Sequence, residues 1–154
     1  MIAFVGGREI YALSNGDTEI RCLTDTLKKH GMLFNLNWSP DGKSLGFTIQ
    51  EDSLSRSTQI CTITIDSKEA RYLTPRGQIH SFGQWLPNGS IMYLEGVFRP
   101  AEYSEETIRP AESDQYLCIM RNDGSEQRRI FHCSSYRGFT YSSDMDNYHV
   151  GAIS

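Results

Sequence analysis

A turn segment that begins with tryptophan occurs twice in this chain of 154 residues. The first copy, residues 38–43, reads W-S-P-D-G-K, and the second, residues 85–90, reads W-L-P-N-G-S. Each copy is followed by an apolar run, L-G-F at 45–47 and I-M-Y at 91–93. Proline, then Asp or Asn, then glycine is typical of a tight turn between two strands. The recurrence predicts a protein built from copies of one strand–turn–strand unit.

A second hairpin pattern recurs three times, starting at Ile10, Ile60 and Leu117. In each copy a short apolar strand leads into a turn rich in Asn, Asp, Gly or Ser, and a second strand follows. The copies align without a gap, and their second strands carry, in chain order, Arg21 and Leu23, Arg71 and Leu73, Arg128 and Ile130. Together the two patterns predict units of four short antiparallel strands.

Successive four-stranded units predict an all-β fold of the β-propeller type, in which sheets called blades follow one another around an axis. The unit boundaries are 1–25, 32–75, 79–132 and 138–154, within a single repeat region that spans 1–154. This gives about three four-stranded blades plus a partial blade. Closed propellers have about four to eight blades. The chain is therefore predicted to be a partial or open propeller, or half of a six-bladed ring.

These motifs make the chain resemble the TolB-type propeller repeat family, whose repeat contains W-S-P-D-G-K before an apolar strand. The resemblance is close at 38–47, fair at 85–93 and weaker at 141–152. The hairpins 10–24 and 60–74 are similar to the second half of that family's repeat, which ends in R-x-L-T. Similar repeats occur in TolB, in the propeller domains of prolyl oligopeptidase-type enzymes and in oligogalacturonate lyase. The resemblance therefore implies a fold and leaves the function open.

The predicted tight turns fall on one side of the sheets and the longer connections on the other, here termed the loop face. The largest connection is the insertion loop 97–115, which is rich in Glu, Pro and Tyr. Loops of this length are commonly functional. We expect an acidic lid or docking loop for a protein partner or a small ligand; the alternative is a surface excursion without a role. The candidate binding residues are Phe98, Arg99, Glu102, Tyr103, Glu105, Glu106 and Arg109.

Three histidines, His30, His80 and His132, each precede a predicted innermost strand on the loop face. Imidazoles that converge near one axis form a candidate site for a divalent metal. The resemblance to oligogalacturonate lyase, whose family has a histidine-containing metal site, implies the same chemistry. The spacing from each histidine to the next aromatic residue differs among the three, which favours loop histidines bonded to water or backbone. We therefore expect no cofactor and keep a divalent metal as the alternative.

Catalytic motifs are missing from the sequence: it has no G-x-S-x-G elbow, no H-E-x-x-H and no P-loop. No catalytic residue is assigned. We expect a non-catalytic binding or scaffold module that uses its loop face. The alternative is the propeller domain of a larger enzyme, either a prolyl oligopeptidase-type peptidase or an oligogalacturonate lyase-type enzyme with a histidine metal site.

Charge and composition limit the classes of partner that we expect the chain to bind. The formal net charge is −4 and no run of Lys or Arg is longer than two residues, which argues against nucleic-acid binding. No apolar run reaches membrane-spanning length, and the start of the chain lacks the pattern of a signal peptide. The four cysteines lack C-x-x-C spacing, so we expect buried thiols. The sequence does not decide between the cytoplasm and the periplasm. It also does not decide whether the chain forms a homo-oligomer.

Overall fold

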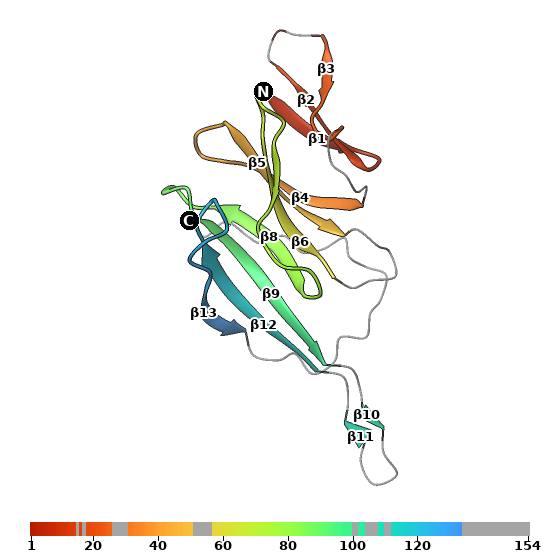
Figure 1. Ribbon diagram of the computed structural model, residues 1–154, viewed down its shortest axis with the longest axis vertical. Coiled ribbons are helices and arrows are strands. Elements are labelled where there is room, and N and C mark those ends of the chain that lie inside the picture. Colours follow the sequence, from red (N-terminus) through yellow and green to blue (C-terminus); the bar gives the residue numbers. More distant parts are fainter. Residues whose placement is uncertain are drawn as a thin grey trace.

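The computed structural model describes residues 1–14, 16, 18–25, 31–50, 57–99, 102–103, 108–109 and 112–133. In this part of the chain every regular element is a strand, and all pairings are antiparallel. Three sheets lie one after another, and a small two-stranded hairpin projects beyond the last of them (Figure 1). The protein is therefore all-β, as the sequence predicts.

The first sheet has three strands, in the order β1 (Ile2–Gly6), β2 (Glu9–Leu13) and β3 (Ile20–Cys22). The second has four: β4 (Met32–Trp38), β5 (Ser44–Gln50), β6 (Gln59–Thr64) and β7 (Ala70–Tyr72). The third also has four: β8 (Ile79–Trp85), β9 (Ile91–Arg99), β12 (Glu112–Met120) and β13 (Arg128–Cys133). The hairpin consists of β10 (Glu102–Tyr103) and β11 (Ile108–Arg109).

The strands of the three sheets lie within residues 2–22, 32–72 and 79–133, and the division into the units 1–25, 32–75 and 79–132 stays a prediction. The fourth predicted unit, 138–154, lies outside the described residues. Both ends of the predicted insertion loop 97–115 are strand instead, because β9 and β12 stay paired as far as Arg99 and Glu112. The ladder continues there because each further pair satisfies backbone groups that a loop would leave to water.

The same turn closes three of the hairpins. In each, a glycine with positive φ follows an Asp or Asn: Gly42 (φ 68°) after Asp41, Gly89 (φ 81°) after Asn88, and Gly124 (φ 85°) after Asp123. The side-chain oxygen of the Asp or Asn accepts the backbone N–H two residues on, at 2.9–3.0 Å. An Asx side chain and a left-handed glycine together hold the chain in the tight reversal that the sequence predicts.

The Leu-Thr pair that ends the second hairpin pattern has a specific structural role. The Thr24 hydroxyl accepts the backbone N–H of Ile10 at 2.9 Å, and the Thr74 hydroxyl accepts that of Ile60 at the same distance. Both threonines are buried. Each hydroxyl therefore satisfies a buried donor at the start of the neighbouring strand, which would otherwise cost about 1–3 kcal/mol. In the third copy Phe131 stands at this position.

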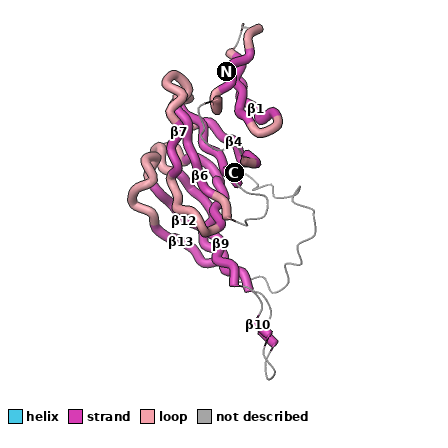
Figure 2. The backbone as a smooth tube through the Cα atoms, turned by 45° about the vertical axis from the view of Figure 1, so that its right-hand side comes forward, coloured by secondary structure: helices cyan, strands magenta, loops and turns pink. Residues whose placement is uncertain are grey.

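Two separate cores hold the sheets together. The first lies between sheets one and two and includes Ile10, Leu23, Leu45, Phe47 and Ile63, with Trp38 packed against it. The second lies between sheets two and three and includes Ile60, Leu73, Phe82, Ile91 and Tyr93, with Trp85 packed against it. The two repeated tryptophans thus both pack between neighbouring sheets, as expected from their equal positions in the repeat. Figure 2 shows the strands of the second and third sheets running side by side.

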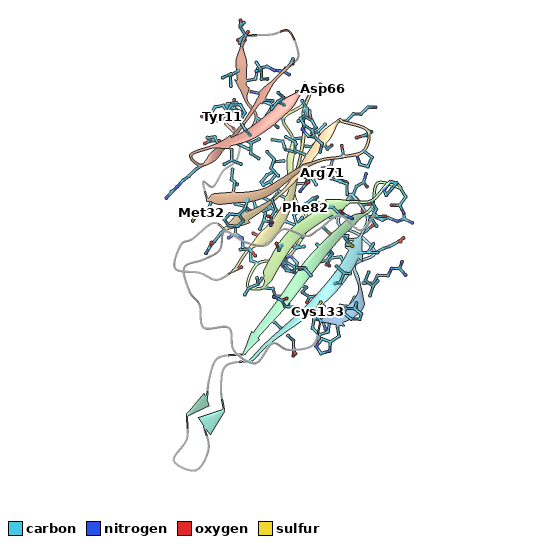
Figure 3. The ribbon with its side chains drawn as sticks, turned by 180° about the vertical axis from the view of Figure 1, so that it is seen from behind. Tyr11, Met32, Asp66, Arg71, Phe82 and Cys133 are labelled. Carbon is cyan, nitrogen blue, oxygen red and sulfur yellow. The ribbon has the colours of Figure 1, made fainter. Side chains whose placement is uncertain are left out.

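The closest approach between sheets two and three is made by a glycine and a phenylalanine. A Cβ added to Gly46 on β5 would lie 2.2 Å from Cε2 of Phe82 on β8, far inside van der Waals contact. The Phe82 N–H donates to the Thr48 hydroxyl, also on β5, at 2.8 Å. Figure 3 shows Phe82 between these two sheets. The missing side chain at position 46 therefore lets the ring lie against the backbone of β5.

Replacing Gly46 with Ala should destabilise the chain by about 1–3 kcal/mol, because the new methyl overlaps the Phe82 ring. Urea unfolding followed by circular dichroism measures the loss. Gly96→Ala is the matched control on β9, where the added Cβ would meet Ile79 at 3.4 Å, an ordinary contact. A Phe82→Leu change should recover part of the loss in the Gly46→Ala background; strictly additive losses would contradict the packing.

Gly42→Val should lower stability for a different reason. Nothing lies within 4 Å of a Cβ at this position, so the cost comes from the positive φ alone, about 1–3 kcal/mol for a β-branched residue. Gly42→Asn is the control, because Asn tolerates the left-handed region. The melting temperature should fall clearly for Val and only slightly for Asn. Equal melting temperatures for the two variants would argue against this turn geometry.

Candidate functional site

The predicted binding residues belong to a projecting arm. We use the name arm for residues 97–114, which comprise the outer ends of β9 and β12 and the β10–β11 hairpin between them. Phe98 and Arg99 end β9, Glu102 and Tyr103 form β10, and Arg109 ends β11. Glu105 and Glu106 lie outside the described residues. The arm extends well away from the three sheets (Figures 1 and 2).

The base of the arm is a regular ladder. β9 and β12 are paired without a register shift from Ile91 and Met120 to Arg99 and Glu112. The hairpin then pairs Glu102 with Arg109 and Tyr103 with Ile108. The β9–β12 ladder holds the base of the arm in place before any partner arrives, which lowers the ordering cost of binding.

The connection that leads to the arm becomes longer from one unit to the next along the chain. Between the two middle strands of each unit, β1 and β2 are joined by residues 7–8, β5 and β6 by 51–58, and β9 and β12 by 100–111. These connections have two, eight and twelve residues respectively, counted from the strand bounds. A connection that lengthens this strongly on an otherwise similar scaffold is typical of a binding element.

The structure describes two of the three histidines of the predicted metal site. His80 lies in β8 and His132 in β13, at the two outer edges of the third sheet, whereas His30 lies outside the described residues. His132 is therefore in the last strand of its unit, and not in a connection leading to the next unit, because β13 pairs with β12 as far as Cys133. Strands β9 and β12 lie between β8 and β13, so three strand spacings, about 14 Å, separate the backbones of the two histidines.

No group of three His, Cys, Asp or Glu side chains suited to a metal occurs among the described residues. The three-histidine metal site remains a prediction.

A row of polar side chains crosses the third sheet instead. His80, Glu95, Tyr116 and His132 stand opposite one another in register on four neighbouring strands. The row faces the second sheet, because the parallel row containing Phe82 and Tyr93 is buried there. This row could not be predicted from the sequence, because its members come from four strands spread over more than fifty residues.

Each member of the row has a partner. Arg129 makes two hydrogen bonds to the Glu95 carboxylate, at 2.7 and 3.0 Å, and its guanidinium lies 4.0 Å from the centre of the Tyr116 ring. The His132 ring stacks on Tyr116 with centroids 4.7 Å apart, and its Nε2 lies 3.3 Å from the Asp114 carboxylate. The row is thus a mutually satisfied ionic and aromatic cluster at the base of the arm.

The titration of these groups reflects the same contacts. Hydrogen bonds from Arg129 lower the pKa of Glu95, so that carboxylate stays charged. Burial raises the pKa of the Cys118 thiol to about 11, with the Glu95 charge adding to the effect. Burial also raises the pKa of Tyr93 and lowers the pKa of His80. At neutral pH Cys118 is a protonated thiol, which is a poor nucleophile.

A groove that sequence reasoning missed lies at the opposite end of the sheets. It has a volume of about 420 Å³ and runs between the tight turns of sheets two and three. Its polar lining includes Asp41, Thr62, Thr64, Arg71, Asn88, Asn122 and Asp123, with Trp85 beside them. The sequence explains Asp41, Asn88 and Asp123 as turn-forming residues. It does not indicate that the three turns line one groove.

The expectation of buried thiols holds for two of the four cysteines. Cys61 and Cys118 are buried, Cys22 and Cys133 are partly exposed, and none of the four cysteines forms a disulfide. Among the described residues no helix is long and apolar enough to cross a membrane.

Comparison with known proteins identifies the fold. Neither the protein-family models nor the curated protein sequences match this chain. Solved structures do match, among them a protein assigned as TolB from Agrobacterium tumefaciens, with 19% sequence identity and a TM-score of 0.56. The match covers 80% of this chain but only 41% of that one. The chain has a TolB-like all-β fold and spans less than half the length of that structure.

Stability should depend on pH through His80. Its pKa is lowered in the folded state by burial, so the unfolded chain binds a proton more readily. Stability is then fully present above about pH 6.5, the pKa of an unperturbed histidine, and falls as the pH drops below that value. Urea unfolding between pH 5 and 8 measures this slope. His80→Gln should flatten it; equal slopes in the parent chain and the variant would refute this assignment.

Proposed function

We propose that this chain is a non-catalytic binding or scaffold module that uses its arm to bind a protein partner. The observation that carries the proposal is the β9–β12 ladder, which is paired without a register shift as far as Arg99 and Glu112, together with the β10–β11 pair beyond it. The first unit closes the same connection with only two residues, so the arm adds nothing that the fold itself requires. Its rigid base and its projection from the body suit a contact surface.

The chemistry of the arm favours a partner with a basic or mixed surface. Its sequence carries Glu102, Glu105, Glu106 and Glu112 against Arg99 and Arg109, which gives a local excess of acidic residues. Tyr103 and Phe98 supply aromatic side chains of the kind that dominate protein interfaces. Opposite charges guide encounter and fix orientation, and aromatic anchors supply most of the affinity.

The arm can be removed without disturbing the sheet. Arg99 and Glu112 are directly paired, so residues 100–111 can be replaced by Asn-Gly, a two-residue turn that suits such a pair. The armless variant should unfold at nearly the same urea concentration as the parent chain. It should lose the protein partners that the intact chain captures from a lysate of its source cells, as measured by quantitative mass spectrometry.

Arg21→Gln is the matched control for that experiment, because Arg21 is an exposed charged residue on the outer strand β3, away from the arm. It should retain the full set of captured proteins. One captured partner is then purified and its dissociation constant measured by calorimetry. Equal affinity for the intact and armless chains would contradict the proposed function.

A further inference from the structure

The first sheet has an apolar face that no described residue covers. Its rows are Ile2, Leu13 and Ile20, followed by Phe4, Tyr11 and Cys22. Ile2 is 60% exposed, Ile20 55% and Phe4 40%. The opposite face of this sheet, with Ile10 and Ala12, is buried against the second sheet. A contiguous apolar face is unusual on a monomer surface and marks an interaction site.

The third sheet has a matching open face at the other end of the molecule. Its apolar residues are Leu94, Leu117 and Phe131 in one row and Met92 and Ile119 in the next; Ser81 flanks the first row, and Gln84 and Arg128 flank the second. Phe131 is 63% exposed, and the other four apolar residues are only partly covered. The opposite face, with Phe82, Tyr93 and Cys118, is buried against the second sheet.

These two faces are the two halves of an interface that already occurs twice within the chain. One repeat position is held by Ile10, Ile60 and Leu117. Ile10 is buried between sheets one and two, and Ile60 is buried between sheets two and three, so each faces the next sheet. Leu117 lies on the open face of the third sheet. The next position holds Tyr11, Cys61 and Cys118. Here Cys61 and Cys118 are buried toward the preceding sheet, whereas Tyr11 lies on the open face of the first sheet.

We propose that the open face of the third sheet binds the open face of the first sheet on a second copy of this chain. The partner is inferred from the two interfaces inside the chain. Sheets one and two each pack one face on the next sheet, and the third sheet leaves the equivalent face open. Sheets two and three each pack the opposite face on the preceding sheet, and the first sheet leaves that face open. Repeat proteins stack in this way because one unit cannot bury its apolar face alone. Two copies would bring six sheets together, within the range of about four to eight found in closed propellers.

Charged substitutions on each face test this directly. The intact 154-residue chain, of 17.5 kDa, should have the mass of two chains by light scattering after size-exclusion chromatography. Phe4→Lys alters the first face and Phe131→Lys the third. Both residues are exposed, so each variant should fold as the parent does, as circular dichroism and urea unfolding would show. Each variant alone should be a monomer, because every contact in the pair contains one altered face.

Mixing the two variants gives the decisive readout. A chain with an intact first face and a chain with an intact third face share one unaltered contact, so the mixture should again have the mass of two chains. The control Met32→Lys changes an equally exposed apolar residue on the middle sheet and should leave the dimer intact. The armless variant should also remain dimeric, since this inference does not rest on the arm.

Three results would overturn the inference: a monomeric parent chain, no recovery of mass on mixing, or a dimer lost in only one of the two single variants. The last outcome would mean that one face pairs with its own copy and not with the other face.

Discussion

The packing of one sheet face on the next is the interaction on which the rest of this structure depends. None of the sheets has more than four strands in the described part, and each needs a neighbour to cover its apolar side. Phe82 lying on Gly46, with its N–H bonded to Thr48, sets the distance between sheets two and three. The Trp85 indole donates to the Asn37 carbonyl across the same boundary at 3.3 Å. Hydrophobic burial and a few directed hydrogen bonds thus fix both the spacing and the register of the sheets.

The third unit departs from the other two in ways that belong together. Its middle strands are longer, its outer strand β13 runs to Cys133, and a register shift occurs between Leu117 and Cys118. Phe131 replaces the threonine that closes the first two copies, so a buried hydroxyl bond gives way to an exposed ring. These changes give one unit both the arm and an apolar open face.

The polar row of the third sheet connects the fold to the arm. Glu95 is largely buried, and its charge is balanced by two hydrogen bonds from Arg129. Removing one member would leave the other as an uncompensated charge, which explains why such a pair favours a single arrangement. Because β9 and β12 carry Glu95 and Tyr116 and then continue into the arm, the cluster stiffens the strands from which the hairpin projects.

Much of the fold was available from the sequence alone. The W-S-P-D-G-K turn, its second copy, and the equal length of the hairpins that start at Ile10, Ile60 and Leu117 predicted an all-β chain of short strands joined by tight turns, because hairpin pairing is local and turn chemistry is specific. The length of the arm's ladder was not predicted, since 97–99 and 112–115 carry no strong strand pattern. The groove between the turns, the row from His80 to His132, and the match between the two open faces emerged only in three dimensions. Each of them depends on which residues of distant strands stand opposite one another, and that register is set by packing between sheets.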